Sequence, residues 1–390
     1  MIPRTIQDTI IQISNKLPVV TITGPRQSGK TTLAKYLFPN HTYINLELSD
    51  NRDLAITDPR SFFALYPPNL ILDEVQRAPH LLSYIQGIVD ERKQNGQFIL
   101  TGSENLLLSE KVNQSLAGRT YIATLLPLSL EELQGLPISF SSYMPCLQKG
   151  FYPRLYDSDL TTSEWLPGYM QTYVERDIRQ LVNVRNLKQF QTFLRLCAGH
   201  ISQIINYTAL SNAVGVNEKT IKAWLSILEA TYIVFTLPPY YNNFKKRLIK
   251  SPKLYFYDTG LACTLLGIHD EKSLIWHPLQ GSLFENFIIV ELLKRHFNRG
   301  LWPQFYFWRD NTGTEVDCLI ESGGKVLAIE IKSTQTLTSF STGNLKKLTT
   351  LMSNNEVEPY IVYGGEHTFN NQEIKVLSWK NLNILLHRGA

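Results

Sequence analysis

The sequence has little cysteine and lacks a long apolar run, and each absence narrows the class of protein. Four cysteines occur among 390 residues, none in a C-x-x-C pair: Cys146, Cys197, Cys263 and Cys318. This spacing argues against zinc and disulfide frameworks and favours a reducing compartment. No stretch approaches the roughly 20 apolar residues of a membrane span, and Asp8 and Lys16 interrupt the apolar N-terminal pattern. We therefore predict a cytoplasmic protein with no membrane partner.

Neither sign of charge dominates the composition. The chain has 38 Lys and Arg against 34 Asp and Glu, with 43% hydrophobic and 18% charged residues. These proportions exclude a disordered or fibrous chain, and the net charge of +4 permits nucleic acid binding without requiring it. Because single cores rarely grow beyond roughly 250 residues, a chain of this length predicts two or three domains.

The clearest motif is a glycine-rich stretch between a predicted strand at 17–22 and a predicted helix that begins at Thr32. It matches G-x-x-x-x-G-K-[ST], in which backbone N–H groups surround phosphate oxygens, the lysine reaches the β- and γ-phosphates and the hydroxyl faces Mg²⁺. The alternative is a glycine-rich turn with a solvated lysine. The predicted nucleotide-binding residues are Gly24, Pro25, Arg26, Gln27, Ser28, Gly29, Lys30, Thr31 and Thr32.

A second motif is an apolar strand, residues 69–72, that ends in Asp73 and Glu74. The carboxyl ends of parallel strands share one edge of a sheet, which places these carboxylates beside the phosphate loop. Asp73 is then expected to hold Mg²⁺ together with Thr31, and Glu74 to polarise the attacking water. The alternative is that both carboxylates only favour the start of a following helix.

Two further positions complete the expected catalytic set. The strand at 97–102 ends near Ser103, the first choice for a residue that senses the γ-phosphate, with Thr101 as the alternative and a plain turn as the structural explanation. Arg119 follows a helical stretch that ends at Gly118. It is expected to neutralise charge on the γ-phosphate, within this chain or from a neighbouring subunit of a homo-oligomer, unless it is a surface or helix-capping arginine.

These motifs together resemble a prokaryotic AAA-type ATPase family whose members carry a C-terminal domain of unknown function. The resemblance rests on residues 24–33, 72–79, 100–103 and 116–119, and it continues through residues 173–178 and 284–286. It implies an α/β fold with a P-loop NTPase parallel sheet, ATP and Mg²⁺ as ligands, and ATP hydrolysis. One departure is Arg154, which follows Phe151-Tyr152-Pro153 where the family pattern leads us to expect an acidic residue.

The proline-rich passage after residue 127 predicts the end of the ATPase core, which we place at 1–150, followed by a helical and winged-helix domain at 151–260. Residues 208–217 and 218–230 have a helix-turn-helix pattern, and strands at 232–237 and 253–257 would form the wing. The basic residues of this wing predict contact with the DNA backbone. They are Lys245, Lys246, Arg247, Lys250 and Lys253. Winged helices also serve as lids or protein-contact modules, which is the alternative.

The third expected domain, residues 261–390, contains a hairpin that turns at 322–324. The two-residue period of a strand places Glu330 and Lys332 on one face beside Asp317. This pattern resembles the restriction-endonuclease signature of Asp followed by Glu-x-Lys. The resemblance implies that Glu285, Asp317 and Glu330 hold a metal ion and that Lys332 assists the attacking water. The alternative is a retained fold whose charges pair structurally.

The function predicted from the sequence is therefore Mg²⁺-dependent ATP hydrolysis, coupled to a winged-helix and nuclease-like module. Two other functions fit the same residues. One is a nucleotide-gated DNA endonuclease, and the other is a non-hydrolysing switch that recruits a partner.

Overall fold

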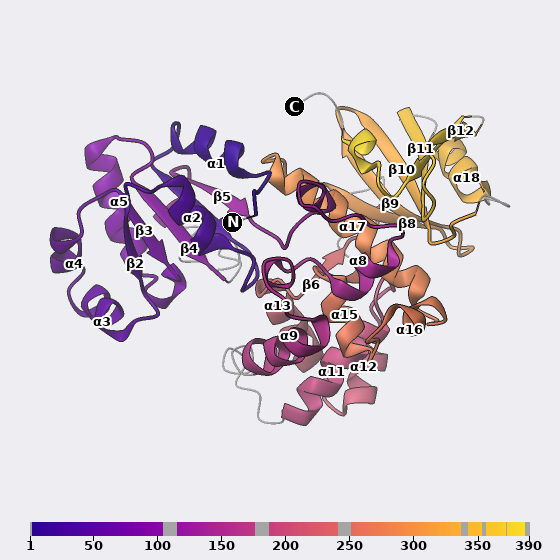
Figure 1. Ribbon diagram of the computed structural model, residues 1–390, viewed down its shortest axis with the longest axis horizontal. Coiled ribbons are helices and arrows are strands. Elements are labelled where there is room, and N and C mark those ends of the chain that lie inside the picture. The colour runs from indigo at the N-terminus through magenta and orange to yellow at the C-terminus, as the bar shows by residue number, and fades with distance from the viewer. Residues whose placement is uncertain are drawn as a thin grey trace.

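The computed structural model describes residues 2–103, 115–175, 187–240, 251–336, 342–352, 356–371 and 373–386. An α/β core at the N-terminus lies on one side of the molecule, and a second sheet formed by the C-terminal part lies on the other (Figure 1). A helical region lies below the gap between these two sheets in the same view. Within the described residues, no helix is long and apolar enough to cross a membrane.

The N-terminal core contains a five-stranded sheet in which every strand pair is parallel, as the sequence predicted. The spatial order is β2-β3-β4-β1-β5. Its strands are β1 (Val19–Thr23), β2 (Thr42–Asn45), β3 (Leu70–Asp73), β4 (Phe98–Gly102) and β5 (Thr120–Thr124). Because β4 lies between β1 and β3, its carboxyl end lies between the glycine-rich loop and Asp73.

Helices cover both faces of this sheet, so the central strands β3 and β4 are mostly apolar and fully buried. Alternate residues point to opposite faces: Leu70 and Leu72 join one apolar cluster, whereas Ile71 joins the other. The first cluster packs under α3 (Ser49–Thr57), α4 (Pro59–Leu65) and α5 (Leu81–Arg92). The second packs under α1 (Gln7–Ser14) and α2 (Lys30–Leu37).

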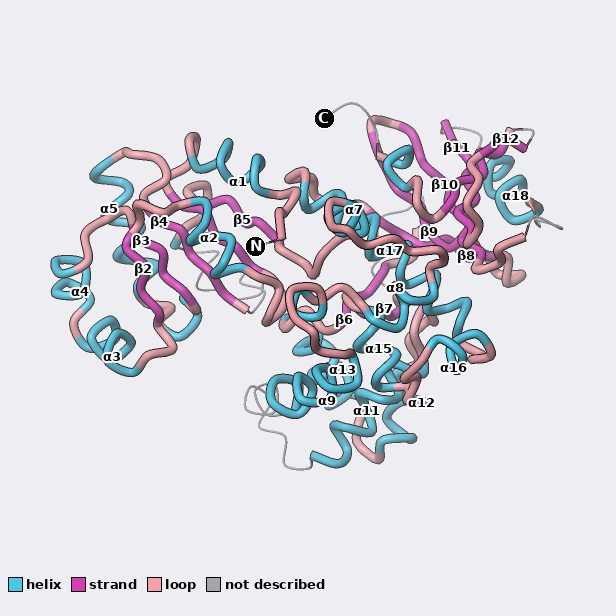
Figure 2. The backbone as a smooth tube through the Cα atoms, viewed as in Figure 1, coloured by secondary structure: helices cyan, strands magenta, loops and turns pink. Residues whose placement is uncertain are grey.

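The middle of the chain is mostly helical (Figure 2). Gly215, with φ of +75°, ends α12 and forms the turn into α13. The strands β6 and β7, which lie within the two strand ranges expected from the sequence, pair antiparallel. The elements are α7 (Leu130–Gln134), α8 (Met144–Lys149), α9 (Thr162–Tyr169), a π-helix (Met170–Glu175), α11 (Leu187–Gly199), α12 (Tyr207–Val214), α13 (Glu218–Ala230), β6 (Val234–Leu237), β7 (Lys253–Phe256), α15 (Thr259–Leu265) and α16 (Glu271–Ile275).

The C-terminal part forms a mixed six-stranded sheet in the order β12-β13-β11-β10-β9-β8. Its strands are β8 (Phe305–Arg309), β9 (Glu315–Ser322), β10 (Lys325–Lys332), β11 (Glu356–Tyr363), β12 (Phe369–Asn371) and β13 (Ile374–Ser378). The predicted hairpin is β9 paired antiparallel with β10. The long helix α17 (Gln280–Asn298) contributes to the apolar cluster on one face, and α18 (Gly343–Leu351) to the cluster on the other.

Helix α17 connects the three parts of the molecule, because it contacts β5 of the core, β7 of the helical region and β10 of the second sheet. A buried ion pair fixes its middle to the segment after β5. Glu291 accepts a hydrogen bond from the Leu130 amide at 2.7 Å, and Lys294 donates to the Leu128 carbonyl at 2.8 Å. The two side chains also pair with each other at 2.8 Å, so neither charge is buried alone.

Candidate functional site

The glycine-rich loop lies between β1 and α2, where two glycines adopt conformations that other residues rarely adopt. Gly24 has φ of +146°, and a Cβ atom there would lie 2.1 Å from the Leu125 carbonyl oxygen. Gly29 has φ of +93° and precedes the first residue of α2. The loop therefore turns tightly into the amino end of a helix, where backbone N–H groups attract phosphate.

Lys30 is buried at the base of this loop. Its ammonium group donates to the carbonyl oxygens of Gly24 at 3.0 Å and Pro25 at 2.8 Å. Burial lowers the pKa of Lys30 to about 8, although the carboxylates of Glu74 and Asp73 oppose this shift. The ammonium group is thus fixed at the loop, and it titrates about one pH unit above neutral pH.

This lowered pKa predicts that MgATP affinity falls as the pH rises. Phosphate binding needs the ammonium form, and a group with a pKa of about 8 is mostly protonated at pH 7 and mostly neutral at pH 9. The dissociation constant for MgATP, measured by fluorescence titration, should rise about tenfold over that range. In Lys30→Arg the charge persists, so the affinity should not change with pH. An equal loss in both proteins would contradict this account of Lys30.

Asp73, at the end of β3, is the centre of a cluster of hydroxyl groups. Thr31 donates to it at 3.1 Å and Tyr43 at 2.7 Å, and Thr101 forms a further hydrogen bond. Burial and the Asp73 carboxylate raise the pKa of Tyr43, which keeps its hydroxyl protonated as a donor. The Thr31 hydroxyl and the Asp73 carboxylate are hard oxygen ligands that suit Mg²⁺, so these residues fit the ion predicted for them.

Glu74 follows Asp73 in a left-handed conformation, with φ of +58°, before the short helix η1 (Val75–Arg77). Ser103 donates to its carboxylate at 3.1 Å, and Gln76 forms a second hydrogen bond to the same oxygen. The two residues considered for the γ-phosphate sensor therefore have different contacts. Thr101 contacts Asp73, whereas Ser103 contacts Glu74.

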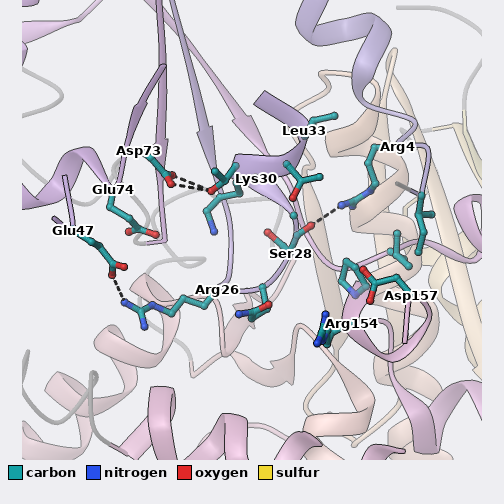
Figure 3. Close-up of a pocket in the computed structure, with 17 residues that line it drawn as sticks. Arg4, Arg26, Ser28, Lys30, Leu33, Glu47, Asp73, Glu74, Arg154 and Asp157 are labelled. Carbon is teal, nitrogen blue, oxygen red and sulfur yellow. Dashed lines mark hydrogen bonds and ion pairs between the residues drawn. The ribbon is translucent and has the colours of Figure 1, made fainter. Parts of the chain in front are cut away.

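A pocket of about 470 Å³ opens beside the loop. Lys30, Thr31, Asp73 and Glu74 line it, together with residues of the loop and of the helical region. Figure 3 shows Arg154 and Asp157 across the pocket from Asp73 and Glu74. Arg154 belongs to the short helix η3 (Pro153–Leu155), so the residue that departs from the family pattern lies at the pocket.

Arg4 holds the loop in place through hydrogen bonds, and no sequence motif predicted this role. Its buried guanidinium donates to the Ser28 carbonyl at 2.7 Å and to the Leu126 carbonyl at 2.7 Å. It also pairs with Glu132 at 3.1 Å, and both side chains are almost fully buried. Arg4 and Glu132 are 128 residues apart, so their pairing produces no periodic pattern in the sequence, and sequence analysis missed it.

Arg119 lies at the opposite edge of the sheet from the loop. It immediately precedes β5, and its carbonyl accepts a hydrogen bond from the Val19 amide at the start of β1. The loop follows the other end of β1, about 16 Å away at roughly 3.3 Å per residue. Arg119 instead forms a two-bond pair with Asp90 of α5, at 2.6 and 2.8 Å. Of the two predicted routes for Arg119, contact with the γ-phosphate within the same chain does not fit this placement, and contact from a neighbouring subunit stays a prediction.

The predicted C-terminal residues do converge, but as ion pairs. Lys332 pairs with Glu330 at 2.6 Å, and the Ile331 amide donates to Asp317 at 2.7 Å. Burial, followed by the charge of Asp317, raises the pKa of Glu285 to about 8 and that of Glu330 to about 7. No group of three or more acidic, histidine or cysteine side chains is arranged to hold a metal ion in the part of the chain that the structure describes. The charges therefore pair within the chain, as the structural alternative predicted, and the metal site stays a prediction.

Lys253 also departs from its prediction. It is 2% exposed, so it is not a solvated residue of a basic wing. Its ammonium contacts Glu285 at 3.0 Å and Glu315 at 2.5 Å. The other predicted wing residues, Lys245, Lys246, Arg247 and Lys250, lie outside the described residues, as do residues 176–178 of the resemblance segment.

The parallel sheet, the loop and the carboxylates at the end of β3 define an AAA-type P-loop ATPase. Residues 16–134 match the AAA domain family, residues 141–272 a domain of unknown function (DUF8612) and residues 280–382 a domain of unknown function (DUF4143). The uncharacterized protein Rv2008c of Mycobacterium tuberculosis is 30% identical over 360 residues, which are 91% of this chain and 78% of that protein. The chain therefore belongs to a prokaryotic family of AAA-type P-loop ATPases with a C-terminal DUF4143 domain.

The chain is also similar to more distant proteins. The uncharacterized protein MJ1544 of Methanocaldococcus jannaschii is 25% identical, over 81% of this chain and 74% of that protein. Among solved structures, the Walker-type ATPase paby2304 of Pyrococcus abyssi is 14% identical with a TM-score of 0.45, and the match covers 68% of this chain and 96% of that one.

Proposed function

We propose that this chain hydrolyses ATP in a Mg²⁺-dependent reaction at the glycine-rich loop. The observation that carries the proposal is the arrangement at the end of β3. Asp73 contacts the Thr31 hydroxyl of the loop, and the next residue, Glu74, faces the same pocket with its carboxylate held by Ser103. A loop alone would serve a kinase or a switch equally well, whereas a fixed carboxylate beside it provides a base for water.

Each residue of the site has a separate role in this reaction. The loop amides and Lys30 bind the β- and γ-phosphates. Thr31 and Asp73 would hold Mg²⁺, which supplies charge neutralisation at the phosphates. Glu74 orients a water molecule and accepts its proton as the water oxygen bonds to the γ-phosphorus and the bond to the ADP oxygen breaks. Ser103 and Gln76 position the Glu74 carboxylate, and Ser103 is also the proposed sensor of the γ-phosphate.

The wall opposite Asp73 is proposed to complete nucleotide binding. Arg154 and Asp157 are both exposed at the pocket, and Arg154 carries a charge that complements phosphate. Because these residues follow the sheet in the chain, ATP would contact the core and the helical region together. Nucleotide binding would then influence how the two regions pack.

Phosphate release from MgATP tests the proposed reaction, measured with and without duplex DNA. The chain should release phosphate with Mg²⁺ and release none when EDTA removes the metal. Tight ATP binding without phosphate release would instead support a non-hydrolysing switch. Stimulation by DNA would connect turnover to the helix-turn-helix.

A second candidate function, DNA binding, is favoured by the outer face of α13. Lys219, Lys222 and Ser226 are exposed and share one side of this helix, because they are spaced three and four residues apart. The inner side is apolar and includes Ile221, Trp224 and Leu228. The second helix of a helix-turn-helix is the element that enters the major groove, and these lysines would contact phosphates there.

Removing both lysines, Lys219→Ala with Lys222→Ala, should weaken binding to any duplex and lower the slope of log K against log salt by about 2. Fluorescence anisotropy at several salt concentrations measures both quantities. Lys272→Ala, which removes an exposed lysine from α16, is the matched control and should leave the slope unchanged. Absence of DNA binding by the wild type at low salt, with ATP turnover intact, would reject this function.

The same proposal retains three functional parts, residues 1–150, 151–260 and 261–390, in a cytoplasmic protein. The four cysteines are all free and buried, which is compatible with a reducing compartment. Since Arg119 lies far from its own loop, a role in catalysis would require a neighbouring copy of the chain.

A further inference from the structure

Four acidic side chains meet where α17, β9 and β10 approach the strand β7. Glu285 comes from α17, Glu315 and Asp317 from β9, and Glu330 from β10. Asp317 and Glu330 are less than a tenth exposed. Burying several carboxylates together is unfavourable unless positive charge is buried with them. The nuclease-like pattern predicted that a metal ion would supply this charge.

The structure supplies the charge from within the chain. The ammonium of Lys253, on β7, lies 3.0 Å from Glu285 and 2.5 Å from Glu315. Burial alone would lower the pKa of Lys253, but Glu285, Asp317 and Glu315 together raise it above its ordinary value, so the lysine stays charged. Tyr255, two residues along the same strand, donates to Glu285 at 2.6 Å.

Asp317 and Glu330 each have at least one carboxylate oxygen in a hydrogen bond or an ion pair. Asp317 accepts from the Ile331 amide, and Lys332 pairs with one oxygen of Glu330. Only the second oxygen of Glu330 is buried without a hydrogen-bond partner among the carboxylates of the described residues. A divalent ion needs several oxygens at about 2.0 to 2.6 Å from one point. Among the described residues, no three acidic, histidine or cysteine side chains are grouped to provide them.

We infer that the ammonium group of Lys253 is the resident cation of this cluster and closes it to divalent metal ions. Lys253 belongs to the helical region, and the carboxylates belong to the C-terminal part. Their ion pairs therefore also connect these two regions. In this conformation the nuclease-like residues cannot bind a catalytic metal ion, because the Lys253 ammonium occupies the cation position. Metal-dependent chemistry there would require β7 to move away from the sheet.

Lys253→Met should open the cluster to metal. Methionine keeps most of the side-chain volume but leaves the carboxylates without their ammonium, which a divalent cation can replace. By isothermal titration, nucleotide-free Lys253→Met should bind one more Mn²⁺ ion than the wild type, in which this cluster binds none. Mn²⁺ should also raise the melting temperature of this variant more than that of the wild type, since each ligand that binds the folded state stabilises it.

Two further variants make the result specific. Adding Asp317→Asn to Lys253→Met should remove the gained Mn²⁺ site. Lys325→Met is the matched control: it also removes a lysine paired with two glutamates, Glu356 and Glu358, but at a half-buried position open to solvent, and it should gain no site. Equal Mn²⁺ binding by the wild type and Lys253→Met would overturn the inference.

A measurement on the wild type does not depend on the folding of the methionine variant. Wild type and Asp317→Asn should bind the same number of Mn²⁺ ions, because the cluster holds none in either protein. One additional ion on the wild type, absent from Asp317→Asn, would show that a metal already occupies the cluster and would overturn the inference.

Discussion

Lys30→Ala is expected to weaken MgATP binding by at least about 100-fold. The lysine ammonium is buried at the base of the loop, within reach of the Gly24 and Pro25 carbonyl oxygens that it contacts. When ATP binds, we expect it to exchange these neutral acceptors for charged phosphate oxygens. Each charge-assisted hydrogen bond contributes about 1.5 to 3 kcal/mol, and two of them correspond to 100-fold or more.

Equilibrium binding of a fluorescent ATP analogue measures this loss. Lys16→Ala is the control, because Lys16 is exposed and follows α1. Its affinity should equal that of the wild type. If Lys30→Ala binds MgATP within threefold of the wild type, the pocket beside the loop is not the nucleotide site.

Glu74→Gln is expected to reduce ATP turnover by about 100- to 1,000-fold while ATP binding persists. Glutamine has the shape of glutamate and can still accept a hydrogen bond from Ser103, so the loop and Asp73 should keep their positions. It cannot accept a proton from water, and a positioned base contributes about 10² to 10⁴ in rate. The loss should therefore fall on the chemical step.

Steady-state phosphate release and the dissociation constant for MgATP separate these two effects. Glu91→Gln, an exposed change on α5, provides the control and should turn over as the wild type does. Loss of ATP affinity in Glu74→Gln would mean that Glu74 organises the pocket. Full turnover would mean that another group activates the water.

Local patterns were sufficient to predict the elements that carry the candidate nucleotide site. An apolar run predicts β1, and the two glycines and the lysine predict the loop and the start of α2. Each of these signals lies in residues that are adjacent in the sequence. The same holds for β3 and for α12 and α13, where Gly215 supplies the turn. Such predictions need only the periodicity of strands and helices.

The sequence did not reveal contacts between residues far apart in the chain. Lys253 looked like one basic residue of a solvated wing, and it is buried because Glu285 and Glu315 approach it from α17 and β9. Arg119 follows glycine in a motif typical of the family, yet the direction of β5 places it away from the loop. Arg4 supports that loop through carbonyl oxygens, which carry no side-chain signature.

The most direct test of the proposed hydrolysis is the identity of the nucleotide that remains bound after incubation with MgATP. Wild type and Glu74→Gln are separated from free nucleotide by gel filtration, denatured, and analysed by chromatography for ATP and ADP. Hydrolysis at this site predicts ADP on the wild type, with phosphate released, and ATP on Glu74→Gln. Intact ATP on both proteins, with no phosphate released by the wild type, would contradict it.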